Sequence, residues 1–156
     1  MPRLWMLTLL LAVVLLPACE EQSGQQPYLE INGGGFVFNY RQAEAYYVLI
    51  AGLKRAPPEG TVFEAEFEDP SGGAPLRVRL PYRAARRVYT FESPPVEGIA
   101  AGREYQVVLR VLSPGGGAPL AEYRKPYHAT LDQSVLPDAP LSVGPGYRQP
   151  PGGQTN

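Results

Sequence analysis

The stretch "TVFEAEFEDPSGGAPLRVRLPY" (residues 61–82) contains two alternating segments separated by a cluster of turn residues. In the first segment Phe or Ala alternates with Glu, and in the second Leu or Val alternates with Arg. Successive side chains of a β-strand point to opposite faces of a sheet, so both segments are typical of strands with one buried and one exposed face. The Asp, Pro, Ser and Gly residues at 69–75 favour a turn between them. The stretch therefore predicts an antiparallel β-hairpin.

Charge complementarity predicts how the strands of two hairpins pair. Opposite charges that face each other across strands stabilise a sheet by roughly 0.2–1 kcal/mol per pair, and a slip of one residue would turn every side chain over. Across residues 69–75 the expected facing pairs are Glu68 with Arg77, Glu66 with Arg79, Phe67 with Val78 and Ala65 with Leu80. Across residues 113–119 the expected facing pairs are Arg110 with Glu122 and Leu109 with Tyr123.

The rest of the central sequence continues this pattern. Apolar, aromatic and β-branched segments alternate with short Pro/Gly clusters, as in an antiparallel fold with frequent turns. The further strand segments are FVFNY (36–40), AYYVLIAGL (45–53), RVYTFES (87–93), EYQVVLRVL (104–112) and PLAEYRKPY (119–127). Because segment 45–53 is apolar at almost every position, we expect it to be buried centrally. About seven short strands of this kind predict an all-β protein, a two-sheet β-sandwich.

The segment 36–40 and the glycines before it predict details of the first strand. Phe36, Phe38 and Tyr40 are two residues apart, so we expect them on one face. The glycines of "NGGG" (32–35) are expected to permit a bulge or a sharp start of this strand.

The segment "IAAGREYQVVLRV" (residues 99–111) resembles the stretch that leads into strand F of fibronectin type III domains. Ile99, Gly102 and Tyr105 match the spacing of an apolar residue, a turn residue and a tyrosine in that family. The resemblance implies a fibronectin type III-like or immunoglobulin-like sandwich in which Tyr105 is a corner tyrosine, its hydroxyl bonded to a backbone group a few residues upstream. In this comparison Arg55 stands where the family has its core tryptophan.

The N-terminus has the features of a secretory signal. Arg3 precedes an apolar run at residues 4–16, and Ala18 is a small residue before a cleavage site. A membrane-spanning helix needs roughly 20 apolar residues, and this run is shorter. We therefore expect residues 1–18 to be a signal peptide that is removed between Ala18 and Cys19.

The sequence Leu16-Pro17-Ala18-Cys19 resembles the lipobox of bacterial lipoproteins. This resemblance implies that Cys19, the only cysteine in the chain, carries a thioether-linked diacylglycerol and an acylated amine. Several acyl chains together give a lasting membrane anchor. The implied location is the cell envelope, facing the periplasm, and Glu20 in place of the aspartate associated with inner-membrane retention favours the outer membrane.

Three regions of the mature chain differ in composition. Residues 19–27 are expected to be the lipidated cysteine and a flexible tether, whose eight residues after Cys19 extend to at most about 28 Å. Residues 28–141 are expected to form the sandwich. Residues 142–156, rich in Gly, Pro and polar residues, are expected to be a disordered tail.

Composition gives little support to nucleic-acid binding, metal binding or catalysis. The net charge is −1 at pH 7, which argues against nucleic acid as a partner. With one His and one Cys we expect no cofactor and no zinc or copper site, and a calcium site at Glu68 and Asp69 is a minor alternative to an ordinary turn. His128, Asp132 and Ser134 lie too close along the chain to converge as a catalytic triad.

Two features point to binding. Arg83, Arg86 and Arg87 form a basic loop suited to lipid phosphates, anionic glycan or an acidic protein, unless neighbouring glutamates balance a plain solvated turn. The chain also has 10 tyrosines, a residue type enriched at interfaces. We therefore expect a non-enzymatic, lipid-anchored module that binds another envelope protein as an accessory or scaffold. The alternatives are a glycan- or cell-wall-binding module and, less favoured, a hydrolase that uses Glu66 and Glu68 as its acid pair.

Overall fold

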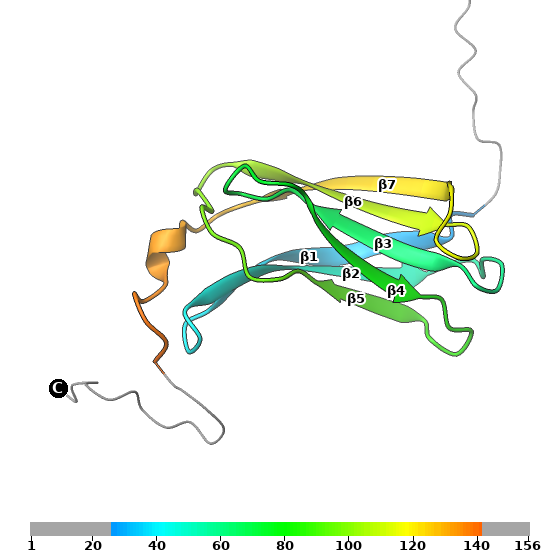
Figure 1. The fold of residues 1–156 in the computed structure, drawn as a ribbon, viewed down its shortest axis with the longest axis horizontal. Helices are drawn as coiled ribbons and strands as arrows, with labels where there is room; N and C mark the ends of the chain where they lie inside the picture. Colours follow the sequence, from blue (N-terminus) through cyan, green and yellow to red (C-terminus); the bar gives the residue numbers. More distant parts are fainter. Residues whose placement is uncertain (1–25, 142–156) are drawn as a thin grey trace, which may run out of the picture.

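The chain folds as an antiparallel β-sandwich, which confirms the all-β prediction (Figure 1). A computed structural model describes residues 26–141. The expected signal peptide, most of the expected tether and the whole of the expected tail lie outside the described residues. The elements are β1 (Leu29–Asn39), β2 (Glu44–Leu53), β3 (Val62–Phe67), β4 (Leu76–Pro81), β5 (Val88–Glu92), β6 (Glu104–Leu112), β7 (Pro119–His128) and the 3₁₀ helix η1 (Gln133–Val135).

The two sheets contain three and four strands, in the orders β1-β2-β5 and β4-β3-β6-β7. They lie face to face in Figure 1, and their edges meet where β1 contacts β7 and β4 contacts β5. The fourth strand pairs with the third. In constant-type immunoglobulin domains the fourth strand instead belongs to the sheet of the first, second and fifth strands. This sandwich therefore has a different strand arrangement from such a domain.

The pairing of β3 with β4 differs from the expected register by two residues. Glu66 faces Arg77 and Glu64 faces Arg79, whereas the sequence predicted Glu68 and Glu66 in these positions. A shift of two residues keeps every side chain on its face, so alternation alone does not distinguish the two registers. The predicted register of β6 and β7 is right, with Arg110 opposite Glu122 and the adjacent inner residues paired as expected.

An aromatic cluster fills the space between the sheets. Tyr47 on β2 is fully buried, with its ring centroid 5.0 Å from that of Phe67 on β3 and 4.4 Å from that of Phe36 on β1. Its hydroxyl donates a hydrogen bond of 2.8 Å to the backbone carbonyl of Glu68. Burial raises the pKa of the Tyr47 hydroxyl well above its usual value, so the group stays protonated and keeps this bond.

Two expectations about the three-stranded sheet need correction. β2 is central in its sheet, but residues 45–51 are buried only at alternate positions, because a second sheet covers just one face; Gly52 is also buried. Tyr40 does not share the face of Phe36 and Phe38. β1 ends at Asn39, whose side chain accepts hydrogen bonds from the next turn, so Tyr40 lies in that turn and is 46% exposed.

The glycines of β1 permit both a bulge and a close approach to β7. The register shifts between Ile31 and Gly33, which places the predicted bulge inside the strand. A Cβ at Gly34 would lie 2.1 Å from the Tyr127 hydroxyl oxygen and 2.2 Å from the Val48 carbonyl oxygen. The Tyr127 hydroxyl donates to the carbonyl of Gly33 at 3.3 Å. The absence of a side chain at Gly34 thus lets the edges of the two sheets meet.

We expect Gly34→Ala to destabilise the fold by about 2 kcal/mol or more, because the added methyl displaces Tyr127 or the β2 backbone. Gly33→Ala is the matched control, since a Cβ there meets nothing within 4 Å and Gly33 does not have the positive φ of Gly34. Urea unfolding of both variants measures the difference. Equal stability of the two variants would contradict the close approach.

Candidate functional site

The segment that the sequence predicts to be a tether enters the sandwich at Tyr28, whose backbone and ring are held by several contacts. Cys19 and Ala18 lie outside the described residues, so the first well-placed contacts are those of Gln26 and Tyr28. The Arg55 guanidinium stacks 3.7 Å from the Tyr28 ring centroid and donates to the carbonyl of Gln26 at 2.9 Å. The Lys54 N–H donates to the Tyr28 carbonyl at 2.9 Å, and the Tyr28 N–H donates to the Tyr123 hydroxyl at 3.0 Å. Arg55, expected at the position of a core tryptophan, therefore fixes the start of the domain.

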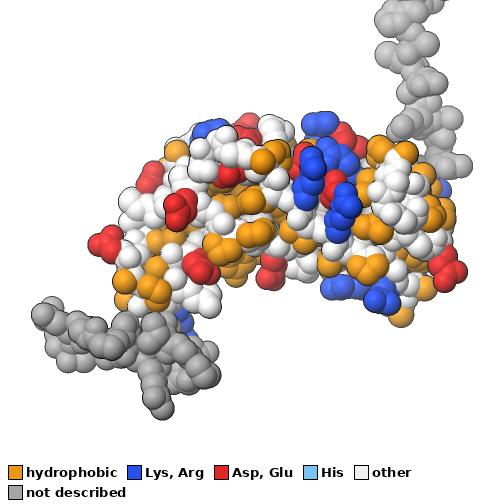
Figure 2. Space-filling view, in the orientation of Figure 1, with side chains coloured by type: hydrophobic (Ala, Val, Ile, Leu, Met, Phe, Trp, Pro, Cys, Tyr) orange, Lys and Arg blue, Asp and Glu red, His pale blue; other side chains and the backbone are white. Residues whose placement is uncertain are grey.

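Charged side chains are segregated between the two ends of the sandwich. We define the tether-side end as the connections at residues 54–61, 82–87 and 113–118, and the far end as residues 40–43, 68–75, 93–103 and 129–141. The tether-side connections contain Lys54, Arg55, Arg83, Arg86 and Arg87, and their single acidic residue is Glu59. The far end contains Glu68, Asp69, Glu97, Asp132 and Asp138, with the cations Arg41 and Arg103. On the visible face, red side chains are scattered over both halves, and most of the blue side chains lie in the right half (Figure 2).

The predicted basic loop lies at the tether-side end and has a defined backbone. The Tyr89 hydroxyl accepts from the Arg83 N–H at 2.9 Å and donates to the Arg83 carbonyl at 3.1 Å. The Leu53 N–H donates to the carbonyl of Arg87 at 2.8 Å, which links the loop to the end of β2. Arg86 donates to the carbonyl of Val88 at 3.0 Å and lies over the Tyr89 ring.

The three arginines of this loop are exposed, and within residues 26–141 none of them forms an ion pair. The expectation that nearby glutamates balance the loop therefore does not hold in the described part of the chain. The loop presents positive charge directly to the surroundings.

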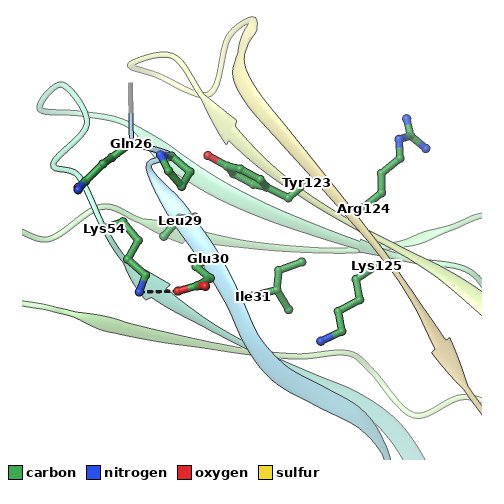
Figure 3. A pocket seen from close by; sticks show the side chains of 9 residues that line it. Gln26, Leu29, Glu30, Ile31, Lys54, Tyr123, Arg124 and Lys125 are labelled. Atoms are coloured by element: carbon green, nitrogen blue, oxygen red, sulfur yellow. Dashed lines mark ion pairs between the residues drawn. The ribbon is translucent and has the colours of Figure 1, made fainter. Parts of the chain in front are cut away.

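A cavity of about 550 Å³ lies between β1 and β7 (Figure 3). Its lining includes Glu30, Ile31, Tyr123 and Lys125, together with Gln26 at the end of the tether. Lys54 forms an ion pair with Glu30 at one side of the opening. The Tyr123 hydroxyl accepts a hydrogen bond from the Tyr28 N–H, and the lining combines apolar side chains such as Leu29 and Ile31 with charged ones such as Glu30 and Lys125. Sequence reasoning missed it because its walls come from two edge strands far apart in the chain.

The outer face of the four-stranded sheet is covered by a network of ion pairs. Arg110 on β6 contacts Glu64, Glu66 and Glu122, with its shortest contacts 3.0 Å to Glu66 and 2.8 Å to Glu122. Further pairs extend the network to both edge strands: Arg77 with Glu66, Arg79 with Glu64, and Arg124 with Glu122. Hydrogen bonds from Arg110 hold the pKa of the Glu66 carboxyl below its usual value of 4.5. Three carboxylates are thus neutralised across four strands.

The alternative acid pair is separated by these contacts. Glu66 belongs to the network, whereas Glu68 pairs with Arg103 at 2.7 Å and accepts a hydrogen bond from the Gln106 N–H. Glu66 is therefore held by arginines, and Glu68 by an arginine and a backbone donor.

The structure also places the remaining polar residues that the sequence singled out. Asp69 accepts from the backbone and hydroxyl of Ser71, which lowers the pKa of its carboxyl and forms the turn between β3 and β4. Asp132 accepts from the Ser134 N–H at the start of η1. His128 lies opposite Glu104 at the end of β7. Among residues 26–141 there is no group of three or more His, Cys, Asp or Glu side chains arranged to hold a metal ion.

Tyr105 is fully buried at the start of β6. Its hydroxyl accepts a hydrogen bond of 2.8 Å from the N–H of Ala100, five residues upstream. This contact has the form expected of a corner tyrosine. It ties the long β5–β6 connection to the sheet and so shapes the far end.

The outer face of the three-stranded sheet carries an apolar patch and lacks a comparable network, although Thr90 and Glu92 of β5 lie opposite Ile50 and Val48 on this face. Val37, Tyr46, Val48, Ile50 and Val88 alternate with the buried residues of their strands and point outward. Ile50 is 36% exposed and Val88 is 50% exposed. The glycines facing Ile50 and Val48 on β1 add no side chains, so this face is flat.

The fold and surface define the chain as an antiparallel β-sandwich protein with one ion-paired outer face and an apolar patch on the other. Comparison with protein-family models, curated protein sequences and solved structures found no match. In the described part of the chain, no helix has both the length and the apolar character needed to span a membrane.

We expect Arg110→Met to lower the free energy of unfolding at pH 7 by about 2–4 kcal/mol, because Glu64, 6% exposed in its side chain, loses one of its two cations. Arg124→Met is the control, since Arg124 is 64% exposed and ends the network, and it should cost less than about 1 kcal/mol. Urea unfolding checks both values.

The difference in the free energy of unfolding between wild type and Arg110→Met should depend on pH through the Glu66 carboxyl. Its pKa in the folded state is lowered from 4.5, so the stabilisation is complete above pH 4.5 and is lost as the pH falls through the lower folded value. The gap between wild type and Arg110→Met should therefore narrow in acid. If the difference in the free energy of unfolding stayed constant until acid unfolds the protein completely, the stabilisation by Arg110 would not be ionic.

Proposed function

We propose that this chain is a lipid-anchored protein of the bacterial cell envelope whose sandwich is a non-catalytic module that binds another envelope protein. The anchor is supported by Leu16-Pro17-Ala18-Cys19, nine residues before the clamped Tyr28. The location faces the periplasm, and Glu20 favours the outer membrane over the inner. Because β4 pairs with β3, the sandwich is closer to a fibronectin type III-like arrangement than to a constant-type immunoglobulin domain.

The apolar outer face of the three-stranded sheet carries the binding role. Its exposed Ile50 and Val88 contrast with the opposite outer face, where the charged groups satisfy one another. Interface centres are depleted of charge and enriched in apolar and aromatic side chains. Val48 and Tyr46 continue this face between Ile50 and the turn after β1. A partner with a complementary apolar strand or helix would cover it.

The anchor is tested by Cys19→Ala. We expect the variant to lose the mass of the acyl chains and to move from the membrane fraction to the soluble fraction. Ser23→Ala, a change within the tether, is the control and should leave both properties unchanged. A Cys19→Ala protein with the mature mass and fractionation of wild type would contradict lipidation.

The binding face is tested by Val88→Lys and Ile50→Lys in the anchored protein. We expect each charge to reduce in-cell cross-linking to specific envelope proteins by about 10-fold or more, since an unpaired cation would be buried in the contact. Leu120→Lys is the matched control, because Leu120 is 42% exposed on β7 of the other sheet. If the same cross-linking partners persist in both variants, this face is excluded as the protein-binding site. Capture of glycan alone would favour a cell-wall-binding module.

A further inference from the structure

The position of the basic loop relative to the tether defines a surface for the lipid bilayer. We propose that the tether-side end, through Arg83, Arg86 and Arg87, lies against anionic lipid headgroups and holds the sandwich upright on the membrane. The inference rests on the proposed anchor at Cys19. It adds a second, electrostatic attachment and a fixed orientation, which lipidation alone does not supply.

The tether leaves the domain at the end that carries the basic residues. Tyr28 is clamped by Arg55 and Lys54, and the arginine loop is bonded to the adjacent end of β2 through Leu53 and Arg87. From Cys19 the eight-residue tether extends to at most about 28 Å. The clamped end is therefore the part of the domain that the anchor keeps near the lipid surface, and Figure 1 shows the far end at the opposite pole.

The charges at this end are available to a ligand. Arg83 and Arg87 are exposed, and their side chains have no ion-pair partner among residues 26–141. Arg86 is held by the Val88 carbonyl and the Tyr89 ring, with its guanidinium still exposed. Arginine binds phosphate through several parallel N–H donors, so three arginines in five residues suit the phosphodiesters of a headgroup layer.

The acidic far end makes the orientation directional. Residues 40–43, 68–75, 93–103 and 129–141 carry five carboxylates against two arginines, so an anionic surface repels that end and attracts the other. Salt screens these forces beyond about 8 Å at physiological ionic strength, so only the end in contact with the surface contributes attraction. An acidic protein would also bind three arginines. The bilayer is the favoured ligand because the proposed anchor keeps this end of the domain near it at all times.

Vesicle co-sedimentation tests the contact without the anchor. The mature chain, residues 19–156 with Cys19→Ser, is mixed with vesicles of phosphatidylcholine alone or of phosphatidylcholine with phosphatidylglycerol, at low and high salt. We expect salt-sensitive binding to the anionic vesicles only. Replacing all three arginines by Gln should weaken it about 100-fold, from the free energy of each basic residue near an anionic surface. Equal binding to neutral vesicles, or none to anionic ones, overturns the proposal.

Two further variants separate the loop from net charge and from folding. Arg83→Gln/Arg87→Gln leaves the contacts of Arg86 in place and should still weaken binding by about 10-fold or more. The triple variant Arg41→Gln/Arg124→Gln/Lys125→Gln removes the same charge from other surfaces and should bind nearly as wild type. If this control variant loses as much vesicle binding as the variant without the three loop arginines, the assignment of the contact to the loop is overturned.

Cysteine labelling tests the orientation in the anchored protein. Cys19 is the only cysteine, so its lipidation leaves no other thiol. A single Ala84→Cys, between the arginines, should react slowly with a membrane-impermeant maleimide on anionic membranes and faster at high salt. Ala101→Cys, exposed at the far end, should react fast in both conditions. Equal rates overturn the orientation while leaving the anchor intact, because the mass and fractionation of Cys19→Ala test the anchor separately.

Discussion

Tyr47 joins the two sheets through both its ring and its hydroxyl. The ring packs between Phe36 of its own sheet and Phe67 of the other, and the hydroxyl reaches the Glu68 carbonyl at the end of β3. A buried hydroxyl without a partner is costly, so the core fixes the distance between the sheets as well as their stacking. The backbone of Glu68 is thereby held at the start of the β3–β4 turn. Its side chain then meets Arg103 and the Gln106 N–H, which orders the far end.

With the inner faces joined, the two outer faces differ in character. The four-stranded sheet uses Arg110 as a bridge between carboxylates on β3 and β7, so its polar groups are satisfied within the domain. The three-stranded sheet has no such bridge among the described residues, and its glycine-rich edge strand places no side chain beside Ile50 and Val48 on the β1 side. A sandwich has two outer faces but needs only its inner faces to fold. The apolar outer face therefore contributes little to folding and is free to serve association.

Side-chain alternation was sufficient to predict the strands and the sandwich, because the period of two is set by strand geometry itself. It was insufficient for the β3–β4 register, since Glu68 is recruited by Arg103 from a distant loop and the turn lengthens accordingly. The charge rule succeeded for β6 and β7, where Arg110 and Glu122 do face each other. The clamp of Arg55 on Tyr28 and the cavity between β1 and β7 join residues far apart in sequence, and no local pattern signals such contacts.

Net charge was a poor guide to the surface because the charges are sorted by position. A total of −1 describes a chain whose connections at one end are basic and whose opposite end is acidic. Strands that run between these ends place the apolar outer face along the long axis of the domain. If the basic end rests on the bilayer, this face stands roughly perpendicular to the membrane plane. A partner reaching it would approach laterally, at a height set by the tether and the length of the strands, so the geometry favours a neighbour held at the same membrane over a ligand that arrives from above.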